Sequence, residues 1–388
     1  MDMIALGPHN PRLDIKDVVI YDSTLRDGEQ TPGIVFSPEQ KITIARKLDE
    51  MHVPEIEAGF PAVSENEQMS VKAISSLGLN ARILTLSRIT KADIDACVEA
   101  GSDLALLFIG TSDIHLKYKF NKPKEFVLEK VAEGLDYCHE RGIAGALSAE
   151  DSTRTEMDFL LKVYRKAEEC HASRIGVTDT LGCASPEAIF NIVTEVKKHL
   201  RTPISVHLHN DFGLALANAI AGVKAGAKAV TTTVNGIGER AGNVPLEQFV
   251  ATMKYVYRCD LGIDATKLKD LSDIVAEYSG LGLPKNQPLV GQNVFSHESG
   301  IHVAAVLNCP MTYEPIPPEE IGNKRHLIMG KKTGLNYVRK RVEDLDLLAS
   351  EEELAKILCE VKKAGERKGR VSDDEFKHIV STVLGGLV

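Results

Sequence analysis

The sequence has 388 residues, enough for one large domain of about 250 residues with smaller appendages. The composition is 43% hydrophobic with a formal net charge of −9, so we expect a substantial core and neither nucleic acid nor a membrane as partner. The seven cysteines are scattered without CxxC spacing, which favours reduced thiols in a cytoplasmic protein over a disulfide framework.

Residues 1–16 carry Pro8 and Pro11 and are expected to form an arm on a surface of this chain or of a partner. This arm lacks the apolar core of a signal peptide, and no run approaches the roughly 18 apolar residues of a transmembrane helix. After it, short β-branched runs alternate with amphipathic segments of helical period. Strands are predicted over residues 18–21, 55–58, 82–86, 104–108, 144–147, 174–177, 205–209 and 229–234. Helices are predicted over residues 38–50, 65–77, 91–100, 123–141, 157–170, 186–199 and 214–225.

Eight strand–helix units in about 235 residues predict a (β/α)8 TIM barrel over residues 17–275, which would be the catalytic domain. A doubly wound open sheet is the alternative, but no GxGxxG follows the first strand, as a dinucleotide-binding fold would require. Beyond the barrel, residues 276–334 are expected to form a linker and subdomain. Residues 335–388 are expected to form a small, mainly helical C-terminal subdomain rich in Lys and Glu.

Polar side chains gather at the predicted carboxyl ends of the strands, the face where barrel enzymes carry out their chemistry. The residues at these ends are Arg26, Asp27, Glu57, Arg88, Ser148, Glu150, Thr178, Thr180, His207, His209, Glu239 and Arg240. The amino ends show no such density, so the sequence predicts an active site at the carboxyl face.

A metal site is predicted from His207 and His209, which lie two positions apart on one strand and therefore share a face. Asp27 ends the first strand, which only the eighth separates from this one in a closed barrel. Two imidazoles and a carboxylate leave positions open on a divalent cation for Lewis-acid catalysis. Asn243, in the glycine-rich stretch after the last strand, could complete the metal shell. The alternatives are two histidines bonded to neighbours and a non-haem iron oxygenase site, although nothing else here suggests oxygen chemistry.

Ser148 and Glu150 share a face by the same two-residue period, and so do Thr178 and Thr180. Hydroxyl groups there would orient the carboxylate of a keto acid, and a carboxylate would serve in proton transfer. Outside the barrel, His302 precedes Tyr313 by eleven positions and could supply a base from a second domain or from a partner subunit. His297 competes for that role, and residue type alone does not decide between the two histidines.

Three motifs carry a resemblance to a known family: residues 22–30 (DSTLRDGEQ), 207–213 (HLHNDFG) and 235–243 (NGIGERAGN). They resemble the 2-isopropylmalate synthase, homocitrate synthase and citramalate synthase family, over about residues 16 to 335. Residues 115–119 (HLKYK) and 297–302 (HESGIH) look most similar to the archaeal homocitrate synthase branch used in methanogen coenzyme B synthesis. The resemblance implies condensation of acetyl-CoA with a 2-oxo acid, followed by hydrolysis of the thioester.

The resemblance also implies roles for individual residues. The implied metal positions are Asp27, His207, His209 and Asn243, with Zn, Mn, Mg or Co as the ion. Arg26 matches the arginine that stabilises the keto oxygen, Gln30 and Thr180 match substrate contacts, and Glu150 matches a glutamate of the proton relay. His302 and Tyr313 match a catalytic pair from the neighbouring subunit of a homodimer, which decides against His297.

Two positions depart from the homocitrate synthases of lysine biosynthesis. Those enzymes carry a histidine after the third strand and an arginine before the Ser/Glu pair of the fifth strand, where this chain has Leu86 and Ala146. The distal carboxylate of 2-oxoglutarate then needs another partner, for which Arg88 is the candidate. Otherwise the substrate is less charged, either 2-oxoisovalerate, giving 2-isopropylmalate, or pyruvate, giving citramalate.

Two further interpretations compete with a synthase. A hydroxymethylglutaryl-CoA lyase-type aldolase shares a similar first motif and the HxH pair, but the segment with His302 and Tyr313 disfavours it. A non-catalytic sensor is disfavoured because it has no use for a general base such as Glu150. The chain ends before the C-terminal regulatory domain of leucine-pathway synthases, so no leucine feedback through such a domain is expected.

Overall fold

The computed structural model describes residues 6–15 and 17–386, and these divide into two units. One unit comprises residues 10–283, and the other comprises residues 284–386 with residues 6–9. Of the predicted N-terminal arm, residues 1–5 and 16 lie outside the described residues. The Leu13 N–H donates to the Tyr257 carbonyl at 3.0 Å, so the end of the arm next to the first strand packs on the barrel unit.

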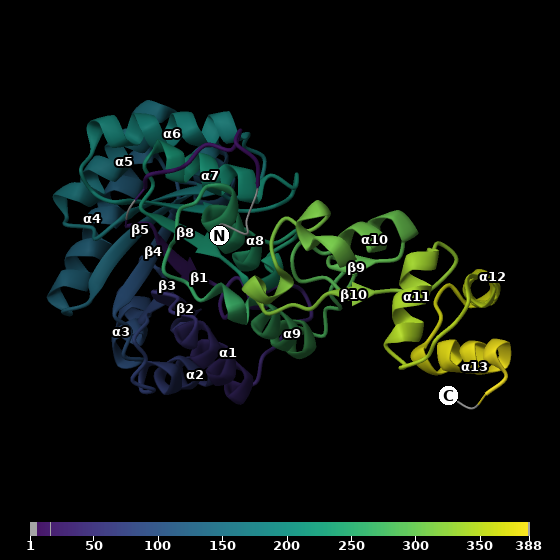
Figure 1. The fold of residues 1–388 in the computed structure, drawn as a ribbon. Helices are drawn as coiled ribbons and strands as arrows, with labels where there is room; N and C mark the ends of the chain where they lie inside the picture. Colours follow the sequence, from purple (N-terminus) through teal and green to yellow (C-terminus); the bar gives the residue numbers. More distant parts are fainter. Residues whose placement is uncertain (1–5, 16, 387–388) are drawn as a thin grey trace. The chain divides into compact units, whose positions relative to one another are not determined.

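Eight parallel strands close into a barrel in the first unit, in the sequence order β1 to β8 (Figure 1). The strands are β1 (Val19–Asp22), β2 (Glu55–Gly59), β3 (Arg82–Arg88), β4 (Leu104–Gly110), β5 (Ala144–Glu150), β6 (Ile175–Asp179), β7 (Ile204–Leu208) and β8 (Ala229–Thr232). Strand β1 pairs with both β2 and β8, which closes the ring. The predicted (β/α)8 barrel is confirmed.

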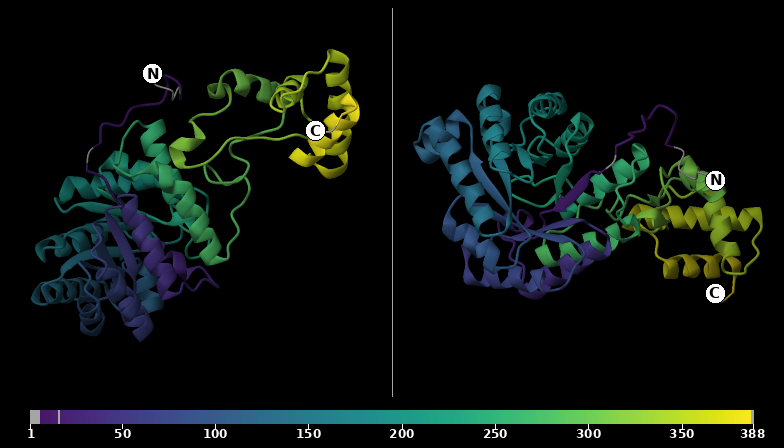
Figure 2. Two further views of the ribbon diagram at one scale, coloured as in Figure 1. Left: turned by 60° about the horizontal axis from the view of Figure 1, so that its bottom comes forward. Right: turned by 90° about the vertical axis from the view of Figure 1, so that its left-hand side faces the viewer.

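Helices surround the barrel on its outer side, as the two further views also show (Figure 2). They are α1 (Pro38–Glu50), α2 (Glu65–Ser75), α3 (Lys91–Glu99), α4 (Lys124–Glu140), α5 (Met157–Glu169), α6 (Pro186–His199), α7 (Ala215–Ala225), α8 (Leu246–Ala251) and α9 (Leu268–Ser279). Ser37, Thr90 and Ser185 each accept a backbone N–H with the side-chain oxygen at the start of a helix. These caps satisfy N–H groups that have no partner within the helix, and they fix where α1, α3 and α6 begin.

The elements differ from the predicted ones mainly at the carboxyl-terminal ends of the strands. Strands β3, β4 and β5 run on to Arg88, Gly110 and Glu150, because parallel neighbours continue the ladder there, with Gly110 opposite Glu150. Strand β7 ends one residue before His209, although the His209 N–H still donates to the Asp179 carbonyl at 3.3 Å. The short helices α8 and α9 and two π-helical segments, His115–Phe120 and Thr252–Val256, were not predicted.

The barrel interior is filled by side chains below the active-site end. Tyr21, Leu84, Leu104, Leu106, Ala146 and Ala229 form one buried cluster from five strands. Buried Glu55 forms ion pairs with Arg174 at 2.6 Å and Arg82 at 3.0 Å. A filled interior of this kind leaves the carboxyl-end mouth as the place for a ligand.

The second unit contains a two-stranded parallel sheet, β9 (Ser296–His297) and β10 (His326–Leu327), and helices α10 (Gly300–Asn308), α11 (Leu335–Glu343), α12 (Glu351–Lys368) and α13 (Asp373–Leu384). Val338, Ile357, Val361, Phe376 and Val380 lie at the centre of its own hydrophobic core. Capping boxes at Ser350 and Ser372 begin α12 and α13. Among the described residues, no helix has the length and apolar character needed to cross a membrane.

Candidate active site

A cavity of about 280 Å³ opens at the carboxyl ends of the barrel strands. Among the residues that line it are the predicted site residues Arg26, Asp27, Gln30, Ser148, Glu150, Thr180, His207 and His209. Asn243 lies beside this wall through its contact with Asp27, whereas Arg88 does not line the cavity. His302 and Tyr313 belong to the second unit.

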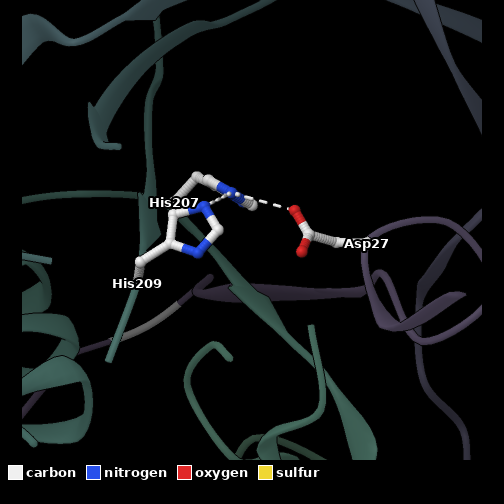
Figure 3. Close-up of side chains that lie close together, drawn as sticks. All are labelled: Asp27, His207 and His209. Carbon is white, nitrogen blue, oxygen red and sulfur yellow. Dashed lines mark hydrogen bonds and ion pairs between the residues drawn. The ribbon is translucent and has the colours of Figure 1, made fainter. Parts of the chain in front are cut away.

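Asp27, His207 and His209 are buried and point toward one another (Figure 3). His207 Nε2 lies 3.4 Å from Asp27 Oδ2 and 3.3 Å from His209 Nε2. One possible ligand atom from each residue lies within 4.8 Å of the others. The structure therefore brings the predicted trio together in a geometry that suits a shared cation, and the role of metal ligand stays a prediction.

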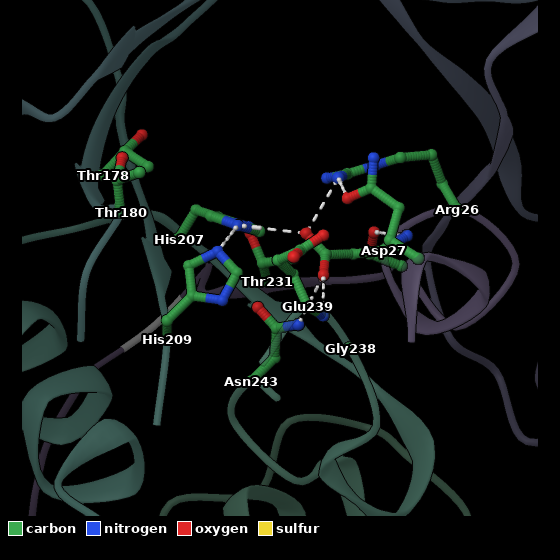
Figure 4. Close-up of polar contacts among 12 residues, drawn as sticks. Arg26, Asp27, Thr178, Thr180, His207, His209, Thr231, Gly238, Glu239 and Asn243 are labelled. Atoms are coloured by element: carbon green, nitrogen blue, oxygen red, sulfur yellow. Dashed lines mark hydrogen bonds and ion pairs between the residues drawn. The ribbon is translucent and has the colours of Figure 1, made fainter. Parts of the chain in front are cut away.

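The loop after β8, residues 235–243, holds the Asp27 carboxylate from below (Figure 4). Asn243 Nδ2 donates to Asp27 Oδ1 at 2.9 Å, and the Glu239 N–H donates to the same oxygen at 3.2 Å. The glycine-rich loop thus binds a carboxylate of the protein itself, that of Asp27. These two donors fix the rotamer of Asp27 and leave Oδ2 for its other partners.

Two glycines in that loop allow the close approach. A Cβ atom on Gly238 would lie 2.1 Å from Asn243 Nδ2. Gly242 has a φ of +86°, and a Cβ there would lie 1.8 Å from the Gly236 carbonyl oxygen. A side chain at position 238 would push Asn243 away from Asp27, and one at position 242 would displace the Gly236 carbonyl, which accepts the Asn243 N–H at 3.0 Å.

Arg26 bridges two carboxylates. One belongs to Asp27, in the cluster of possible metal ligands that also contains His207 and His209, and the other belongs to Glu57 on β2. Arg26 Nε and Nη2 donate to Glu57 at 2.7 and 2.9 Å, and its Nη1 donates to Asp27 at 2.8 Å and to Gln30 at 3.3 Å. Glu57 is fully buried and also accepts the Ser23 hydroxyl at 2.5 Å. The guanidinium is held on two sides, so it presents a fixed positive charge at the cavity wall.

The electrostatics favour an ionised Asp27 beside a neutral His209. Burial alone would raise the pKa of Asp27, but the Arg26 guanidinium and the bond to His207 hold it well below its ordinary value. Burial, together with neighbouring His207, lowers the pKa of His209 to about 4. In these states the carboxylate and the imidazole both offer lone pairs, as binding of a metal requires.

Hydroxyl groups from β5 and from the end of β6 form another wall of the cavity. Ser148 and Thr178 share a hydrogen bond of 2.9 Å, and Thr180 Oγ1 accepts the Asp151 N–H at 2.8 Å. Because that N–H is donated to it, the Thr180 hydroxyl keeps its own proton for a ligand. This wall suits an anionic group such as a carboxylate.

Glu150 lines the cavity and is paired with Lys119, which the sequence did not suggest. Lys119 Nζ donates to both carboxylate oxygens, at 2.8 and 2.6 Å. His115 Nδ1 lies 3.8 Å from Glu150, and both partners come from the π-helical segment His115–Phe120. The similarity noted for residues 115–119 therefore falls on the immediate surroundings of Glu150.

The far end of the cavity is apolar. Leu86, Leu106 and Ala146 line it there, from three neighbouring strands. Arg88 lies outside it, because its Nε and Nη2 donate to Asp93 at 2.7 and 3.0 Å in the first turn of α3. Within the described lining, the lysine and arginine side chains are those of Arg26 and Arg240 alone, and both are already paired.

In the second unit, His302 and Tyr313 are exposed and stack on each other, with ring centroids 4.0 Å apart. His297, the competing histidine, is buried instead. Its Nε2 lies 3.2 Å from Glu314 Oε1, and Arg325 donates to both oxygens of the same carboxylate at 2.6 and 2.5 Å. This buried group fixes Glu314, the residue next to Tyr313, which supports His302 over His297 as the histidine available to a ligand.

Comparison with known proteins finds two family matches along the chain. Residues 17–275 match the HMGL-like family, and residues 289–369 match the homocitrate synthase post-HMGL domain-like family. The first match spans the whole barrel, well over half of the described chain. The chain belongs to the HMGL-like family.

Relatives of this HMGL-like chain are similar over most of their length. It is 50% identical to a homocitrate synthase AksA of Methanocaldococcus jannaschii, covering 98% of this chain and 94% of the relative. It is 49% identical to the homocitrate synthase AksA of Methanopyrus kandleri, covering 96% and 94%. A 2-isopropylmalate synthase of Methanocaldococcus jannaschii is 44% identical, covering 97% of this chain and 73% of the relative.

Among solved structures, the HMG-CoA lyase of Bacillus subtilis matches with a TM-score of 0.64 and 19% identity, covering 71% of this chain and 97% of that one. An HMG-CoA lyase of Acinetobacter baumannii, in complex with coenzyme A and 3-methylmalate, matches with a TM-score of 0.60 and 21% identity, covering 69% and 92%. At these identities the likeness concerns the barrel fold alone.

The donor set in this HMGL-like chain fits a divalent cation. Asn243 Oδ1 and His209 Nδ1 are buried and have no hydrogen-bond partner among the described residues. A buried polar atom without a partner is costly, so such atoms point to a missing ligand or a strained site. Oxygen and nitrogen donors suit Zn, Mn, Mg or Co.

Sequence reasoning placed Glu57 at a strand end without giving it a role, and it missed Lys119 as the partner of Glu150. The signal for Glu57 was available, because Glu55 and Glu57 alternate on a strand that is otherwise apolar, and buried carboxylates need cationic partners. Lys119 carried no such signal, because its pairing depends on how the π-helical segment folds over Glu150.

Proposed function

We propose that this HMGL-like protein is an enzyme that condenses acetyl-CoA with 2-oxoglutarate to form homocitrate, with release of CoA. The observation that carries this proposal is the 45–50% identity to three relatives named homocitrate synthase over nearly the whole chain. The cavity supports it independently, because it combines a fixed arginine, a wall of hydroxyl groups and a cluster of metal-type ligands.

The proposed reaction has two stages. A base removes a methyl proton from acetyl-CoA, the resulting carbanion forms a bond to the keto carbon, and the keto oxygen becomes an alkoxide that takes up a proton. Water then attacks the thioester, and the C–S bond breaks to give the free acid and CoA. The methyl group is a weak carbon acid, so placement of the base and exclusion of water must supply several kcal/mol.

Arg26 is proposed to bind the keto oxygen and stabilise the negative charge that develops on it. The guanidinium is held by Glu57 and Asp27 before substrate arrives, so little reorganisation accompanies the reaction. Ser148 and Thr180 are proposed to bind the carboxylate next to the keto group. Gln30, which lines the cavity beside Arg26, is a further proposed contact.

Asp27, His207, His209 and Asn243 are proposed to hold a divalent cation, which when bound supplies Lewis-acid polarisation of the keto group. Glu150 is proposed to relay protons, with Lys119 holding its carboxylate in place. The cytoplasmic location and a role in coenzyme B synthesis stay predictions.

His302 and Tyr313 are proposed to act on the barrel of a neighbouring subunit in a homodimer. Two chains with complementary defects test this: Arg26→Gln disables the barrel, and His302→Ala disables the pair. If each pair serves the partner's barrel, a mixed dimer of the two inactive variants contains one intact site and regains activity. If the pair serves its own barrel, no mixed dimer is active.

A second candidate is supported by the apolar end of the cavity. Leu86, Leu106 and Ala146 offer no cation to a distal carboxylate, and Arg88 is engaged by Asp93. These contacts favour an aliphatic acid, which makes 2-isopropylmalate synthesis from 2-oxoisovalerate or citramalate synthesis from pyruvate the alternative.

A thiol-release assay with acetyl-CoA and each of the three 2-oxo acids decides between these substrates. Release of CoA with 2-oxoglutarate, at a kcat/KM at least tenfold above the other acids, is the expected result. A preference for 2-oxoisovalerate or pyruvate would select the alternative. Absence of thiol release with every acid, with cleavage of a hydroxyacyl-CoA instead, would overturn the synthase proposal in favour of a lyase.

A further inference from the structure

We infer that the second unit carries a binding site for a nucleotide-sized phosphomonoester. A cavity of about 670 Å³ is lined there only by residues of that unit. Its volume lies within the roughly 300–1,000 Å³ that is usual for small-molecule sites, and it exceeds the space that inorganic phosphate needs. None of the residues proposed above for catalysis lines it.

The floor of this cavity is one face of the small β9–β10 sheet. Ser296 is paired in register with His326, and both line the cavity. Because successive strand residues point to opposite faces, His297 and Leu327 point away from it. The buried contact between His297 and Glu314 holds the back of the sheet in place.

Backbone hydrogen bonds fix the two walls against this floor. The Asn293 N–H donates to the Lys285 carbonyl at 2.8 Å and closes the loop that precedes β9. On the other side, the Val371 N–H donates to the Met329 carbonyl at 2.9 Å and places Arg370 beside the end of β10. The cavity is therefore built from three chain segments that are tied to one another.

Two cationic side chains and an imidazole without partners in residues 6–15 and 17–386 distinguish this cavity. The side chains of Lys285, His326 and Arg370 line it, and none makes an ion pair or hydrogen bond within the described part of the chain. Arg325, by contrast, is fully engaged by Glu314. The one carboxylate in the lining, Glu298, already accepts the Lys332 N–H at 3.1 Å.

This donor set matches a phosphomonoester. Lys285 and Arg370 are both charged at pH 7, and a phosphomonoester carries nearly two negative charges and three acceptor oxygens. Ser296, Asn293 and His326 add donors for those oxygens or for a sugar. A carboxylate carries a single negative charge and would balance only one of the two positive charges.

Binding to the full chain tests the site directly. The probes are adenosine 3′,5′-bisphosphate and, as the uncharged control, adenosine, both measured by isothermal titration calorimetry. The bisphosphate should bind and adenosine should not. The double variant Lys285→Glu/Arg370→Glu should bind at least about tenfold more weakly, because the charged hydrogen bonds of both cations are lost and two like charges face the phosphates. The matched control Lys356→Glu, an exposed cation on α12, should bind like the wild type.

Two sources share this chemistry, the nucleotide end of the CoA co-substrate and a free nucleotide that regulates the enzyme. The first rests on the proposed function. In that case the double variant raises KM for acetyl-CoA at least about tenfold at constant kcat, and 3′-dephospho-acetyl-CoA shows no such difference between variant and wild type. For a free nucleotide, KM is unchanged and the added bisphosphate alters the rate of the wild type only.

The calorimetric measurement needs no turnover. It therefore tests the phosphomonoester site even if the proposed synthase activity is wrong. Absence of bisphosphate binding, or equal binding by wild type and double variant, would overturn the inference. The milder pair Lys285→Gln/Arg370→Gln serves if the charge reversals perturb folding by circular dichroism. It should weaken binding in the same direction.

Discussion

The His302 ring lies stacked on the Tyr313 ring, with the two planes inclined by 30° and centroids 4.0 Å apart. The two residues flank the α10 helix end and the short 3-10 turn Pro310–Thr312, so the chain doubles back to bring them together. Both are exposed in the described unit, unlike most stacked aromatic pairs of a core. The stacking holds an exposed imidazole and an exposed phenol side by side, where both can reach a ligand, as proton transfer to or from it requires.

Replacing that imidazole should separate catalysis from metal binding. His302→Ala is expected to lower kcat by at least about 100-fold, the usual size of a general acid–base contribution, while the bound metal is kept. Metal content and kcat are measured on the same preparation, with His378→Ala on α13 as an exposed control. Loss of metal along with activity would show that the role of His302 is misassigned.

Unlike His302→Ala, the His209→Ala variant should lose both its bound metal and its activity. Removing one of the four proposed protein ligands is expected to lower affinity for Zn²⁺ or Mn²⁺ by about 100-fold or more. His115→Ala is the matched control, because His115 lies near Glu150 and outside the cluster. A His209→Ala protein with full metal stoichiometry after dialysis would contradict the proposed ligand set.

Arg26 and Glu57 should be coupled in stability as well as in function. Arg26→Gln leaves the fully buried Glu57 carboxylate without its cation, which is expected to cost about 3–5 kcal/mol of unfolding free energy. Adding Glu57→Gln removes the uncompensated charge and should recover much of that loss. Denaturant unfolding of the two single variants and the double variant gives the coupling energy, and strictly additive losses would refute it. Activity should stay about 100–1,000-fold low in the double variant, because the donor to the keto oxygen is still missing.

Asp22 on β1 should make stability depend on pH. Its carboxylate accepts the Thr24 N–H at 2.9 Å and the Thr232 hydroxyl at 3.2 Å, and burial raises its pKa from 3.8 to about 6. The folded state therefore holds this proton more tightly than the unfolded state. The free energy of unfolding falls as pH rises from about 4 to about 6, and the full loss of about 3 kcal/mol persists at higher pH.

Asp22→Asn should remove that dependence while keeping both hydrogen bonds, since an amide can accept from Thr24 and donate to Thr232. The gain in unfolding free energy of the variant over wild type should be up to about 3 kcal/mol larger at pH 7 than at pH 4. Urea titrations at several pH values measure it, with Asp136→Asn on the solvent face of α4 giving the background. A difference that stays constant with pH would rule out Asp22 as its source.

The barrel and the metal-type cluster were predictable from local pattern. Buried β-branched runs mark interior strands, and the two-residue period of a strand is enough to put His207 and His209 on one side. The same period predicts an inward Arg88, following Leu84 and Leu86, yet Arg88 turns outward. Thr90 caps α3 by accepting the Asp93 N–H. This cap places the Asp93 carboxylate in the first helical turn, where it binds Arg88 and holds that side chain away from the cavity. Whether Arg88 faces the cavity or binds Asp93 depends on where α3 lies in space, and the sequence pattern does not give that position.

The apolar end of the cavity has a consequence for how substrate preference changes during evolution. Arg26 and the proposed metal ligands lie at the ends of β1 and β7 and in the loop after β8, whereas Leu86, Leu106 and Ala146 lie on β3, β4 and β5, in the opposite arc of the ring. Resizing these three aliphatic side chains alters the length of tail that can be accommodated without disturbing Arg26 or the imidazoles. On the proposed function, substitutions at these three positions change which 2-oxo acid fits and leave the residues proposed for catalysis in place.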